Sequence, residues 1–347
     1  MAASANSSET SRQTPAHSTP PNSAPPAEGV RLHWPDLPAP LRAQIERLVG
    51  SRVIDAATQR GGFSPGLAAR LRLQNGQRVF AKAISPQQNP SAPRMHRREA
   101  AIVAAMPPHA PVPRLLDTYD EGPDGWIVLV YEDIEGRNPA TPWQPLELDR
   151  VLVAASELAT TLTFAPNQTV SNVFDQLVPT AGDRLARGIS GWQKLQADPA
   201  LCKELDDWSA RHLNQLADLE THAPAAAAGH TLLHFDLRAD NVLLTADRVW
   251  FVDWPHAALG AAWIDVMLMA PSVTMQGGPP PAELLARQPH AQTADPAAIT
   301  AGITAMAGFF TYQALLPPPP GLPTLRAFQA AQGTVARAWL AQRTGWK

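Results

Sequence analysis

The sequence has a single cysteine and no long apolar run, and each of these shortages excludes a class of protein. Because Cys202 is alone among 347 residues, neither an internal disulfide nor a zinc site built of thiolates can form. The longest apolar stretch, residues 257–273, is interrupted by Asp265, whereas a membrane-spanning helix needs about 20 apolar residues. We therefore expect no contact with a membrane, and the scarcity of cysteine is compatible with a cytoplasmic protein.

A strong excess of charge of either sign is also absent. The formal net charge is −3 and the isoelectric point is near 6.4, so nothing electrostatic favours nucleic acid or an anionic membrane as a partner. Apolar residues make up 45% of the sequence and charged residues 17%, a balance typical of a folded globular protein. A chain of 347 residues is long enough to form two lobes.

Residues 1–30 contain almost no large apolar side chains and consist mainly of Ser, Ala, Pro, Asn and Thr. Such a segment buries too little surface to offset the loss of chain entropy, so we expect a disordered tail. It has neither a basic start nor an apolar central run, so we expect no secretory signal.

Two strand-like runs, residues 67–73 and 78–84, flank the dipeptide Asn75-Gly76. This arrangement predicts a β-hairpin, because a type I′ turn needs positive φ at both central positions. Lys82 lies in the second strand among apolar neighbours on both faces. Its side chain either lies at the solvent rim of the strand or reaches into a cleft toward an anion, and the pattern alone does not choose between these alternatives.

A helix is predicted over residues 91–106 and carries Glu99, seventeen residues after Lys82. Kinases pair a strand lysine with a helix glutamate at similar spacing, and this ion pair holds the ammonium against the nucleotide phosphates. Alone, Glu99 would be read as a solvated residue paired with Arg97 or Arg98.

The segment of residues 61–66, here called the glycine loop, precedes the first strand of the hairpin. Glycine lets a backbone N–H approach phosphate closely, as Gly62 would, and the Ser64 hydroxyl adds a donor. The loop has neither the glycine spacing of protein kinases nor the ending of a P-loop. Its position before the hairpin is therefore the main reason to assign it to phosphate binding.

Residues 126–131 form an almost wholly apolar run that leads into Glu132, Asp133 and Ile134. A buried strand that emerges into a short acidic connector suits a hinge between two lobes. The backbone of Glu132, Asp133 and Ile134 would then hydrogen-bond the edge of an adenine. A strand that simply ends in a polar turn explains the same residues equally well.

The segment of residues 234–241, here called the catalytic loop, carries the densest chemistry of the chain. Asp236 is placed to accept the proton of an attacking hydroxyl, and Arg238 adds positive charge toward a γ-phosphate. Two short apolar runs follow and predict a hairpin that brings Asn241 and Asp253 together. Amide and carboxylate oxygens are hard ligands that suit Mg²⁺.

A polar turn capped by its own side chains would explain Asp236 and Asn241 alone. Their occurrence after Lys82, Glu99 and the glycine loop, in the order found in kinases, favours phosphoryl transfer instead.

On these residues the chain resembles the aminoglycoside phosphotransferase family, the small-molecule branch of the protein-kinase-like fold, from about Gly61 to Asp265. The resemblance implies that Asp236 is the catalytic base, that Asn241 and Asp253 bind Mg²⁺, and that Lys82, held by Glu99, contacts the α- and β-phosphates. It further implies that Asp265 braces the catalytic loop. The sequence departs from many members at Phe235 and Arg238, where the family often has Gly and His.

The predicted fold is α+β and bilobal, with a small antiparallel sheet in the N-lobe and a larger, mostly helical C-lobe. The predicted boundaries are a tail at 1–30, an N-lobe at 31–133 and a C-lobe at 134–347. The candidate site residues are Asp236 and Arg238 for catalysis, Gly62, Ser64, Lys82, Glu99, Glu132, Asp133 and Ile134 for the nucleotide, and Asn241 and Asp253 for the metal.

We expect an enzyme that uses ATP and Mg²⁺ to phosphorylate a hydroxyl of a small molecule, with GTP not excluded and the oligomeric state left open. A protein kinase is disfavoured, because no Ala-Pro-Glu element and no long insert follow Asp253. A catalytically silent scaffold that binds nucleotide remains the alternative. A pocket for a cationic antibiotic would need clustered carboxylates, and the candidates for it, which also fit a solvated helix face, are Glu204, Asp206, Asp207 and Glu220.

Overall fold

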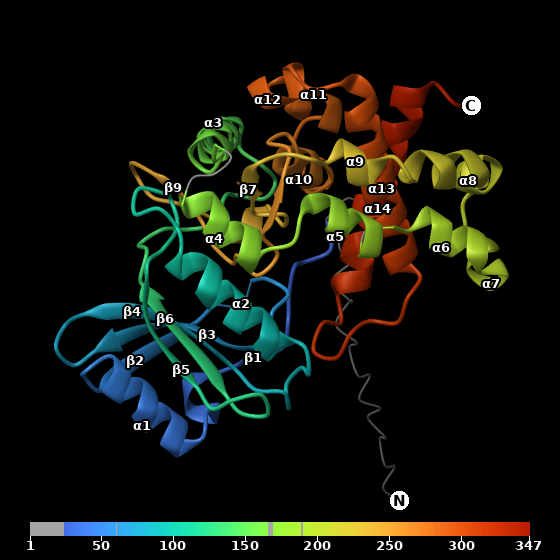
Figure 1. Ribbon diagram of the computed structural model, residues 1–347. Coiled ribbons are helices and arrows are strands. Elements are labelled where there is room, and N and C mark those ends of the chain that lie inside the picture. Colours follow the sequence, from blue (N-terminus) through green and yellow to red (C-terminus); the bar gives the residue numbers. More distant parts are fainter. Residues whose placement is uncertain (1–23, 60, 166–168, 189) are drawn as a thin grey trace, which may run out of the picture.

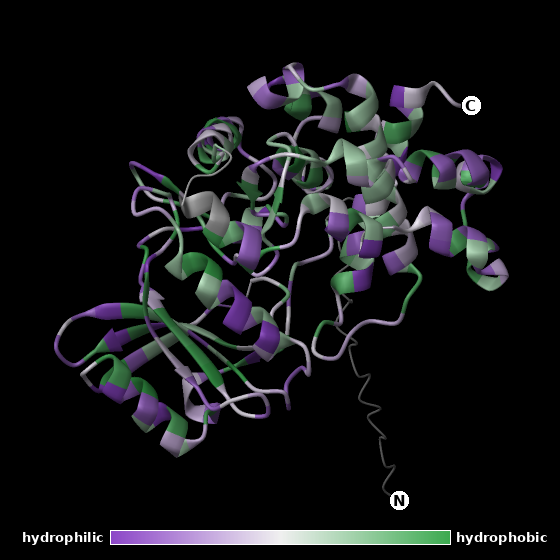
Figure 2. Ribbon diagram, viewed as in Figure 1, coloured by the Kyte–Doolittle hydropathy of each residue, from purple (hydrophilic) through white to green (hydrophobic). Residues whose placement is uncertain are grey.

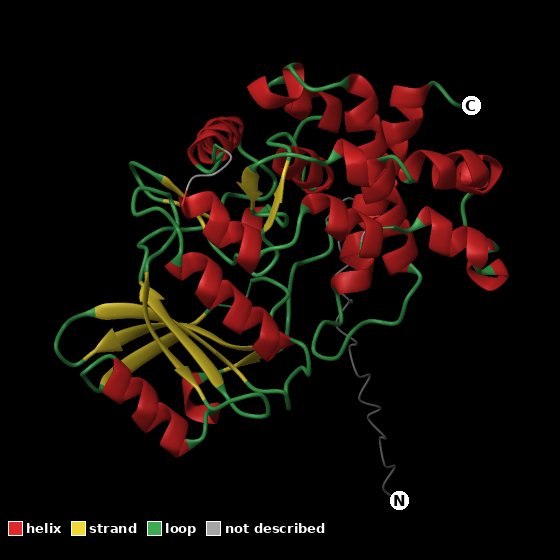
Figure 3. Cartoon of the chain, in the orientation of Figure 1, coloured by secondary structure: helices red, strands yellow, loops and turns green. Residues whose placement is uncertain are grey.

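The computed structural model describes residues 24–59, 61–165, 169–188 and 190–347. Its N-terminal part is built around a sheet and its C-terminal part is mainly helical, as Figures 1 and 3 show. The predicted α+β architecture, with a smaller sheet-containing part and a larger helical part, is therefore confirmed. The exact lobe boundary between residues 133 and 134 stays a prediction.

Six strands form the sheet of the N-terminal part, in the spatial order β1-β3-β4-β6-β5, with β2 also paired to β3. They are β1 (Arg31–Leu32), β2 (Val53–Thr58), β3 (Gly66–Leu73), β4 (Arg78–Ile84), β5 (Leu115–Asp120) and β6 (Ile127–Glu132). All of the pairings are antiparallel except that of β1 with β3, which is parallel.

Two glycines fix the hairpin of β3 and β4. A turn at Asn75-Gly76 joins the two strands as predicted, but only Gly76, with a φ of 86°, has positive φ. The predicted type I′ turn, which needs positive φ at Asn75 as well, is therefore wrong. Gly66 has a φ of 96°, and a Cβ atom there would lie 2.5 Å from the carbonyl oxygen of Ala83. The resulting register places Lys82 in the middle of the sheet, opposite Leu129 of β6.

The two faces of the sheet are covered by different helices. Leu41 and Ile45 of α1 (Ala39–Leu48) pack into the apolar cluster on one face. The other face is covered by α2 (Ala92–Ala104), which Figure 1 shows between the sheet and the helical part. Because side chains alternate along a strand, Lys82 points to this second face and toward the interior of the molecule.

The C-terminal part is a packed set of helices. They are α3 (Pro145–Thr161), α4 (Thr169–Leu177), α5 (Ala181–Arg187), α6 (Trp192–Ala197), α7 (Pro199–Cys202), α8 (Asp207–Glu220), α9 (Ala223–Ala226), α10 (Ile264–Met275), α11 (Pro281–Ala286), α12 (Pro289–Gln292), α13 (Pro296–Ala314) and α14 (Leu325–Thr344). Figure 2 shows α13 and strand β6 largely in the colours of apolar residues. In the described part of the chain, no helix is long and apolar enough to cross a membrane.

Two short strand pairs flank the catalytic loop. β7 (Thr231–Leu233) pairs with β10 (Ala258–Gly260), and β8 (Val242–Leu244) pairs with β9 (Val249–Phe251). The catalytic loop connects β7 to β8 and includes a short 3-10 helix, η2 (Ala239–Asn241). The predicted hairpin after this loop is therefore present.

Residues 1–23 of the predicted tail lie outside the described residues, whereas residues 24–30 form an extended segment. The backbone N–H of Gly62 donates to the carbonyl of Ala27 at 2.9 Å, and that of Val30 donates to Gly321 at 2.9 Å. The Thr324 hydroxyl donates to the carbonyl of Glu28 at 3.2 Å. This N-terminal segment thus joins the glycine loop to the loop before α14.

Candidate active site

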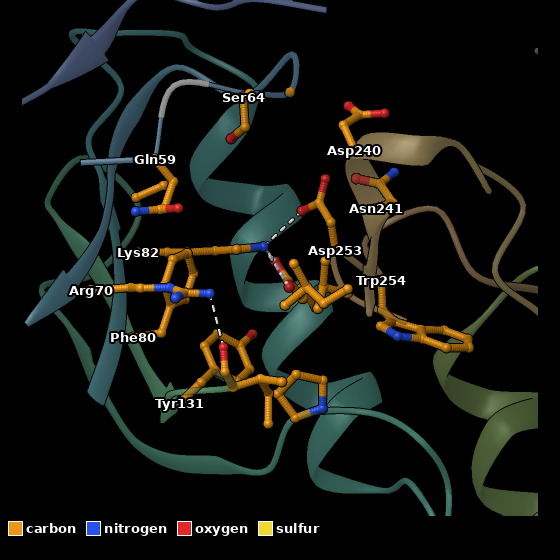
Figure 4. Close-up of a pocket in the computed structure, with 18 of the residues that line it drawn as sticks. Gln59, Ser64, Arg70, Phe80, Lys82, Tyr131, Asp240, Asn241, Asp253 and Trp254 are labelled. Atoms are coloured by element: carbon orange, nitrogen blue, oxygen red, sulfur yellow. Dashed lines mark hydrogen bonds and ion pairs between the residues drawn. The ribbon is translucent and has the colours of Figure 1, made fainter. Parts of the chain in front are cut away.

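Lys82 is the centre of a buried charge cluster. Its ammonium donates to both carboxylate oxygens of Glu99, at 2.7 and 2.9 Å, and to Asp253 Oδ1 at 2.7 Å. Lys82 is 9% exposed and Glu99 only 2%, so the structure supports the cleft alternative for Lys82 and not the solvent rim. Figure 4 shows the Lys82 ammonium directed at Asp253 across the pocket.

The pKa values follow from this cluster. Burial would lower the pKa of Lys82, but the Asp253 and Glu99 carboxylates outweigh burial and raise it. Burial would raise the pKa of Asp253, but the Lys82 ammonium outweighs it and holds that pKa well below the ordinary value. Lys82 and Asp253 are therefore both charged at neutral pH.

The glycine loop is held from one side by Arg31 of β1. The guanidinium donates to the carbonyl oxygen of Gly61, at 2.6 Å, and to that of Ser64. Gly62 and Ser64 line the same cavity as Lys82. Arg31 was not predicted as a site residue, because nothing in the sequence links it to a loop 30 residues further on.

The acidic connector after β6 also lies against this cavity, which Glu132, Asp133 and Ile134 help to line. The Asp133 side chain is 3% exposed and forms ion pairs with Arg78 at 2.7 Å and Arg70 at 3.3 Å. Arg70 also donates to the carbonyl of Ile134 at 2.8 Å. The carboxylate of Asp133 thus fixes the connector, which leaves backbone groups as the candidates for contact with a base.

Asp265 holds the start of the catalytic loop. Its two oxygens accept the backbone N–H groups of His234 and Phe235, both at 2.8 Å. His234 Nδ1 accepts the N–H of Asp236 at 3.3 Å, and Nε2 lies 2.9 Å from the carbonyl of Val252, so the hydrogen bonds assign the proton to Nε2. Asp265 and His234 together tie the catalytic loop to α10 and to the segment after β9.

Two residues of the site have left-handed backbone. Phe235 has a φ of 66° and Asp253 a φ of 70°, a region that non-glycine residues rarely adopt. Such a conformation costs about 1–3 kcal/mol and persists where surrounding contacts enforce it. Phe235 precedes the predicted base and Asp253 is a predicted metal ligand, and no sequence pattern indicates this strain.

Arg238 binds two carboxylates of its own loop. Its guanidinium donates to Asp236 Oδ1 at 2.5 Å and to the two oxygens of Asp240 at 3.0 and 2.8 Å. The rings of Phe63 and Phe328 lie 5.3 and 5.8 Å from it, within range of cation–π attraction. Its charge, predicted to face a γ-phosphate, is thus already opposed by Asp236 and Asp240.

Asn241 lies beside Asp236 and close to Asp253. Its side-chain Nδ2 donates to the backbone carbonyl of Asp236 at 2.8 Å, and its backbone carbonyl accepts the N–H of Val252 at 3.0 Å. Asn138 donates to the carbonyl of Val242 at 2.8 Å and supports the same turn. Figure 4 shows Asn241 and Asp253 on the same side of the pocket.

Two cavities meet at these residues. The first cavity, about 300 Å³, lies between the glycine loop, the sheet, the connector after β6 and residues Asn241 and Asp253. The second cavity, about 710 Å³, lies between α2, α5, the catalytic loop, α13 and α14, and Asp236 lines it. Ser64, His96 and Asp253 line both cavities, so the two cavities are adjacent at these residues.

The acidic residues considered for a cationic pocket lie elsewhere. Glu204, Asp206, Asp207 and Glu220 are not among the described residues that line the second cavity. Asp206 pairs with Arg337 at 2.9 Å, and buried Glu220 accepts the backbone N–H of Gly191 at 2.7 Å. These two carboxylates are therefore engaged in holding helices together.

Comparison with solved structures places the fold among small-molecule kinases. A thermostable mutant of the aminoglycoside phosphotransferase APH(4)-Ia, in a ternary complex with AMP-PNP and hygromycin B, is 17% identical with a TM-score of 0.57, and the match covers 89% of this chain and 100% of that chain. APH(2")-IIia, in a GDP and kanamycin complex, is 12% identical with a TM-score of 0.59 and coverages of 89% and 99%. A putative fructosamine-3-kinase from Thermobifida fusca YX-ER1 is 17% identical with a TM-score of 0.52 and coverages of 86% and 98%.

These similarities define a protein-kinase-like fold of the kind used by phosphotransferases, as predicted. The model of the phosphotransferase enzyme family matches residues 62–301, well over half of the 347 residues. The chain belongs to this family, and the resemblance inferred from the sequence is confirmed. A search of curated proteins found no match to this sequence.

Proposed function

We propose that this protein transfers the γ-phosphoryl group of ATP to a hydroxyl of a small molecule in a Mg²⁺-dependent reaction. The observation that carries the proposal is the meeting of two cavities at Asp253, with Lys82 in the first and Asp236 in the second. A phosphoryl donor in one and a hydroxyl in the other would face each other across this junction. Family membership supports phosphoryl transfer as the reaction class.

The first cavity is suited to a nucleoside triphosphate. The Lys82 ammonium, the Arg31 guanidinium and the glycine loop line it and offer N–H donors to phosphate. The connector of residues 132–134 lies at another wall and offers backbone groups to a base. Because Lys82 is held by buried Glu99, its ammonium is fixed before a ligand arrives, which reduces the cost of ordering it on binding.

The residues present fit a magnesium ion. Asn241 uses Nδ2 for the carbonyl of Asp236, which leaves its Oδ1 for another partner, and Asp253 uses Oδ1 for Lys82. The described residues contain no group of three or more His, Cys, Asp or Glu side chains that could hold a metal. Asn241 and Asp253 would hold the ion, and Mg²⁺ commonly binds through one or two protein oxygens together with water and substrate phosphates. When bound, the ion would neutralise phosphate charge.

Asp236 supplies the base on the acceptor side. The proton of the acceptor hydroxyl would pass to an oxygen of Asp236 as the hydroxyl oxygen forms its bond to phosphorus and the bond to the leaving nucleotide breaks. Arg238 holds one oxygen of Asp236 at 2.5 Å and Asn241 fixes its carbonyl, so the carboxylate is oriented before the acceptor binds. Arg238 is therefore proposed to position the base.

Thermal unfolding with ATP, GTP and each nucleotide plus Mg²⁺ tests the nucleotide site. A ligand at about 100 times its Kd should stabilise the fold by roughly 2.7 kcal/mol, a shift of a few degrees. The shift should depend on Mg²⁺ and disappear in Asp253→Ala. Asp247→Ala, an exposed position in the β8–β9 turn, is the matched control and should keep the shift.

Acceptor-dependent formation of the nucleoside diphosphate is then measured with the same variants. No nucleotide shift in the wild-type protein would contradict the proposal and favour a scaffold. Undiminished turnover by pure Asp253→Ala protein would contradict the metal assignment.

A further inference from the structure

The second cavity has largely apolar walls. At about 710 Å³ it has room for a drug-sized molecule. Five of its lining residues are phenylalanines, contributed by four separate points of the chain: Phe63, Phe235, the adjacent pair Phe309 and Phe310, and Phe328. Such a surface favours a ligand with an apolar or aromatic body over a heavily hydroxylated one.

The carboxylates of this cavity are already paired with cations of the chain. Asp236 binds Arg238 at 2.5 Å, Asp253 binds Lys82 at 2.7 Å and Asp183 lies 3.6 Å from Arg187. A polycationic acceptor would have to compete with these partners for each carboxylate. The cavity therefore offers little to a ligand of high positive charge.

Two arginines of the same cavity lack a carboxylate partner among the described residues. Arg98 of α2 and Arg184 of α5 both donate to the carbonyl of Ala257, at 2.7 and 3.4 Å. The Nε atom of each is buried without a hydrogen-bond partner. Burial, together with the nearby Arg98 charge, lowers the pKa of Arg184 to about 10, so the group remains protonated at neutral pH. The Asp236 carboxylate, whose charge also acts on Arg184, is already paired with Arg238, so the two cations that converge on one carbonyl leave an excess of positive charge.

This positive charge lies next to the catalytic loop. The Arg184 guanidinium stands 5.5 Å from the ring of Phe235, the residue before Asp236. Gln332 of α14, only 4% exposed, lines the same cavity and adds an amide on another wall. An anion held by the two arginines would thus place the rest of its molecule between the phenylalanines and Asp236.

We propose that the acceptor is a hydroxy acid with an apolar body, whose carboxylate binds between Arg98 and Arg184 while its hydroxyl faces Asp236. Paired arginines recognise a carboxylate through charge-assisted, often bidentate hydrogen bonds. The assignment of the hydroxyl to Asp236 rests on the proposed function, whereas the anion site does not. A preference for an anionic acceptor would distinguish this protein from relatives that bind cationic antibiotics.

A series of probes of similar size but different charge tests the anion site by calorimetry without nucleotide. The probes are 3-phenyllactate, which is anionic, 3-phenyllactamide, which is neutral, and phenylalaninol, which is cationic. We expect phenyllactate to bind at least about tenfold more tightly than the other two. The double variant Arg98→Gln/Arg184→Gln should remove this preference. Arg94→Gln, exposed and one turn earlier on α2, is the matched control and should retain it.

The single variants Arg98→Gln and Arg184→Gln are measured as well, so that poor folding of the double variant leaves two independent tests. Tighter binding of phenylalaninol or kanamycin than of phenyllactate would overturn the inference, as would a charge preference that survives the loss of both arginines. Absence of phenyllactate binding would do the same. Inorganic phosphate that competes as tightly as phenyllactate would show a general anion site and overturn the hydroxy-acid assignment.

Turnover of phenyllactate with ATP and Mg²⁺ separates the two proposals. If the charge preference is found but no acceptor is phosphorylated, the anion site stands and the proposed reaction fails. If phenyllactate is phosphorylated, its KM should rise at least about tenfold in Arg98→Gln, with a smaller effect on kcat, because the arginines bind the acceptor and do not touch the reacting atoms.

Discussion

The first and second cavities differ in how their charges are balanced. In the first, Lys82 is neutralised by Glu99 and Asp253, and Asp133 is neutralised by Arg70 and Arg78. In the second, Arg98 and Arg184 share only a carbonyl oxygen. The charged groups of the first cavity are thus held in place before any ligand binds. The second cavity has positive charge that an anionic ligand would neutralise.

The cavities also differ in how the chain builds them. Much of the first comes from the β3–β4 hairpin, the connector after β6 and the β8–β9 hairpin. The second is gathered from α2, α5, the catalytic loop, α13 and α14, which are distant in sequence. Local sequence motifs can build a site for a phosphoryl donor that many proteins share. A site for a particular phosphoryl acceptor depends on how helices that are distant in sequence pack together.

The largest effect is expected at the residue between donor and acceptor. Asp236→Asn should lower turnover by about 10²–10⁴-fold, because the amide cannot accept the hydroxyl proton. Steady-state kinetics measures this loss, and thermal shifts should show that the nucleotide still stabilises the variant. The exposed Asp247→Asn should behave as wild type. A variant that also loses nucleotide binding would show that the two cavities are not separable.

The next largest effect is expected in the buried cluster of the first cavity. Lys82→Met leaves Glu99 buried and unpaired and should cost about 3–5 kcal/mol in the free energy of unfolding, measured by urea denaturation. Lys82→Met/Glu99→Leu should recover much of this loss. Arg78→Met, which removes an exposed guanidinium and leaves Asp133 paired with Arg70, should cost much less. A similar loss for Lys82→Met and Arg78→Met would show that the first cavity is not preorganised by its buried charges.

A smaller effect is expected where the catalytic loop is held. Asp265→Asn should cost up to about 3 kcal/mol, because an amide replaces a carboxylate that accepts two backbone N–H groups. Asp295→Asn, at the exposed cap of α13, is the control. If the loop is loosened, turnover should fall more than nucleotide binding. An equal fall in turnover and in nucleotide binding would show that Asp265 supports both cavities and not the catalytic loop alone.

The smallest effect concerns His96, which lines both cavities. Burial, helped by the Lys82 charge, lowers the pKa of His96 to about 4. The unfolded chain then binds more protons than the folded one between about pH 6.5 and 4, so stability falls as the pH falls through this window. At pH 5 this proton uptake by the unfolded chain should lower the free energy of unfolding by about 2 kcal/mol relative to neutral pH. His96→Gln should flatten the curve of unfolding free energy against pH in this range. An unchanged curve would show that His96 is more hydrated than its position between the cavities implies.

Much of the first cavity was predictable from the sequence, because its motifs are local. Asn75-Gly76 predicted a hairpin, and the spacing of Lys82 and Glu99 predicted a strand lysine paired with a helix glutamate. In the structure Lys82 Nζ lies 2.7 Å from Glu99 Oε1. Asn241 and Asp253 flank two short apolar runs, so their proximity followed from a predicted hairpin. Their roles in binding nucleotide and metal stay predictions.

The rest depended on tertiary contacts that leave no local pattern. Arg31 reaches the glycine loop from a strand 30 residues earlier, and Arg98 and Arg184 converge only because α2 and α5 both pack near Ala257. An arginine on a helix is indistinguishable in sequence from a solvated one. The cluster of Arg238 with Phe63 and Phe328, whose rings also contact each other, joins residues from distant parts of the chain.

The N-terminal segment has a mechanical consequence. Ala27 is bonded to the glycine loop, while Glu28 and Val30 are bonded to residues 324 and 321 of the helical part. Any movement that lifts the glycine loop away from those residues must break one set of these hydrogen bonds. Since each of these hydrogen bonds contributes only about 1 kcal/mol net, the segment restrains the glycine loop weakly, and a small input of free energy suffices to release it.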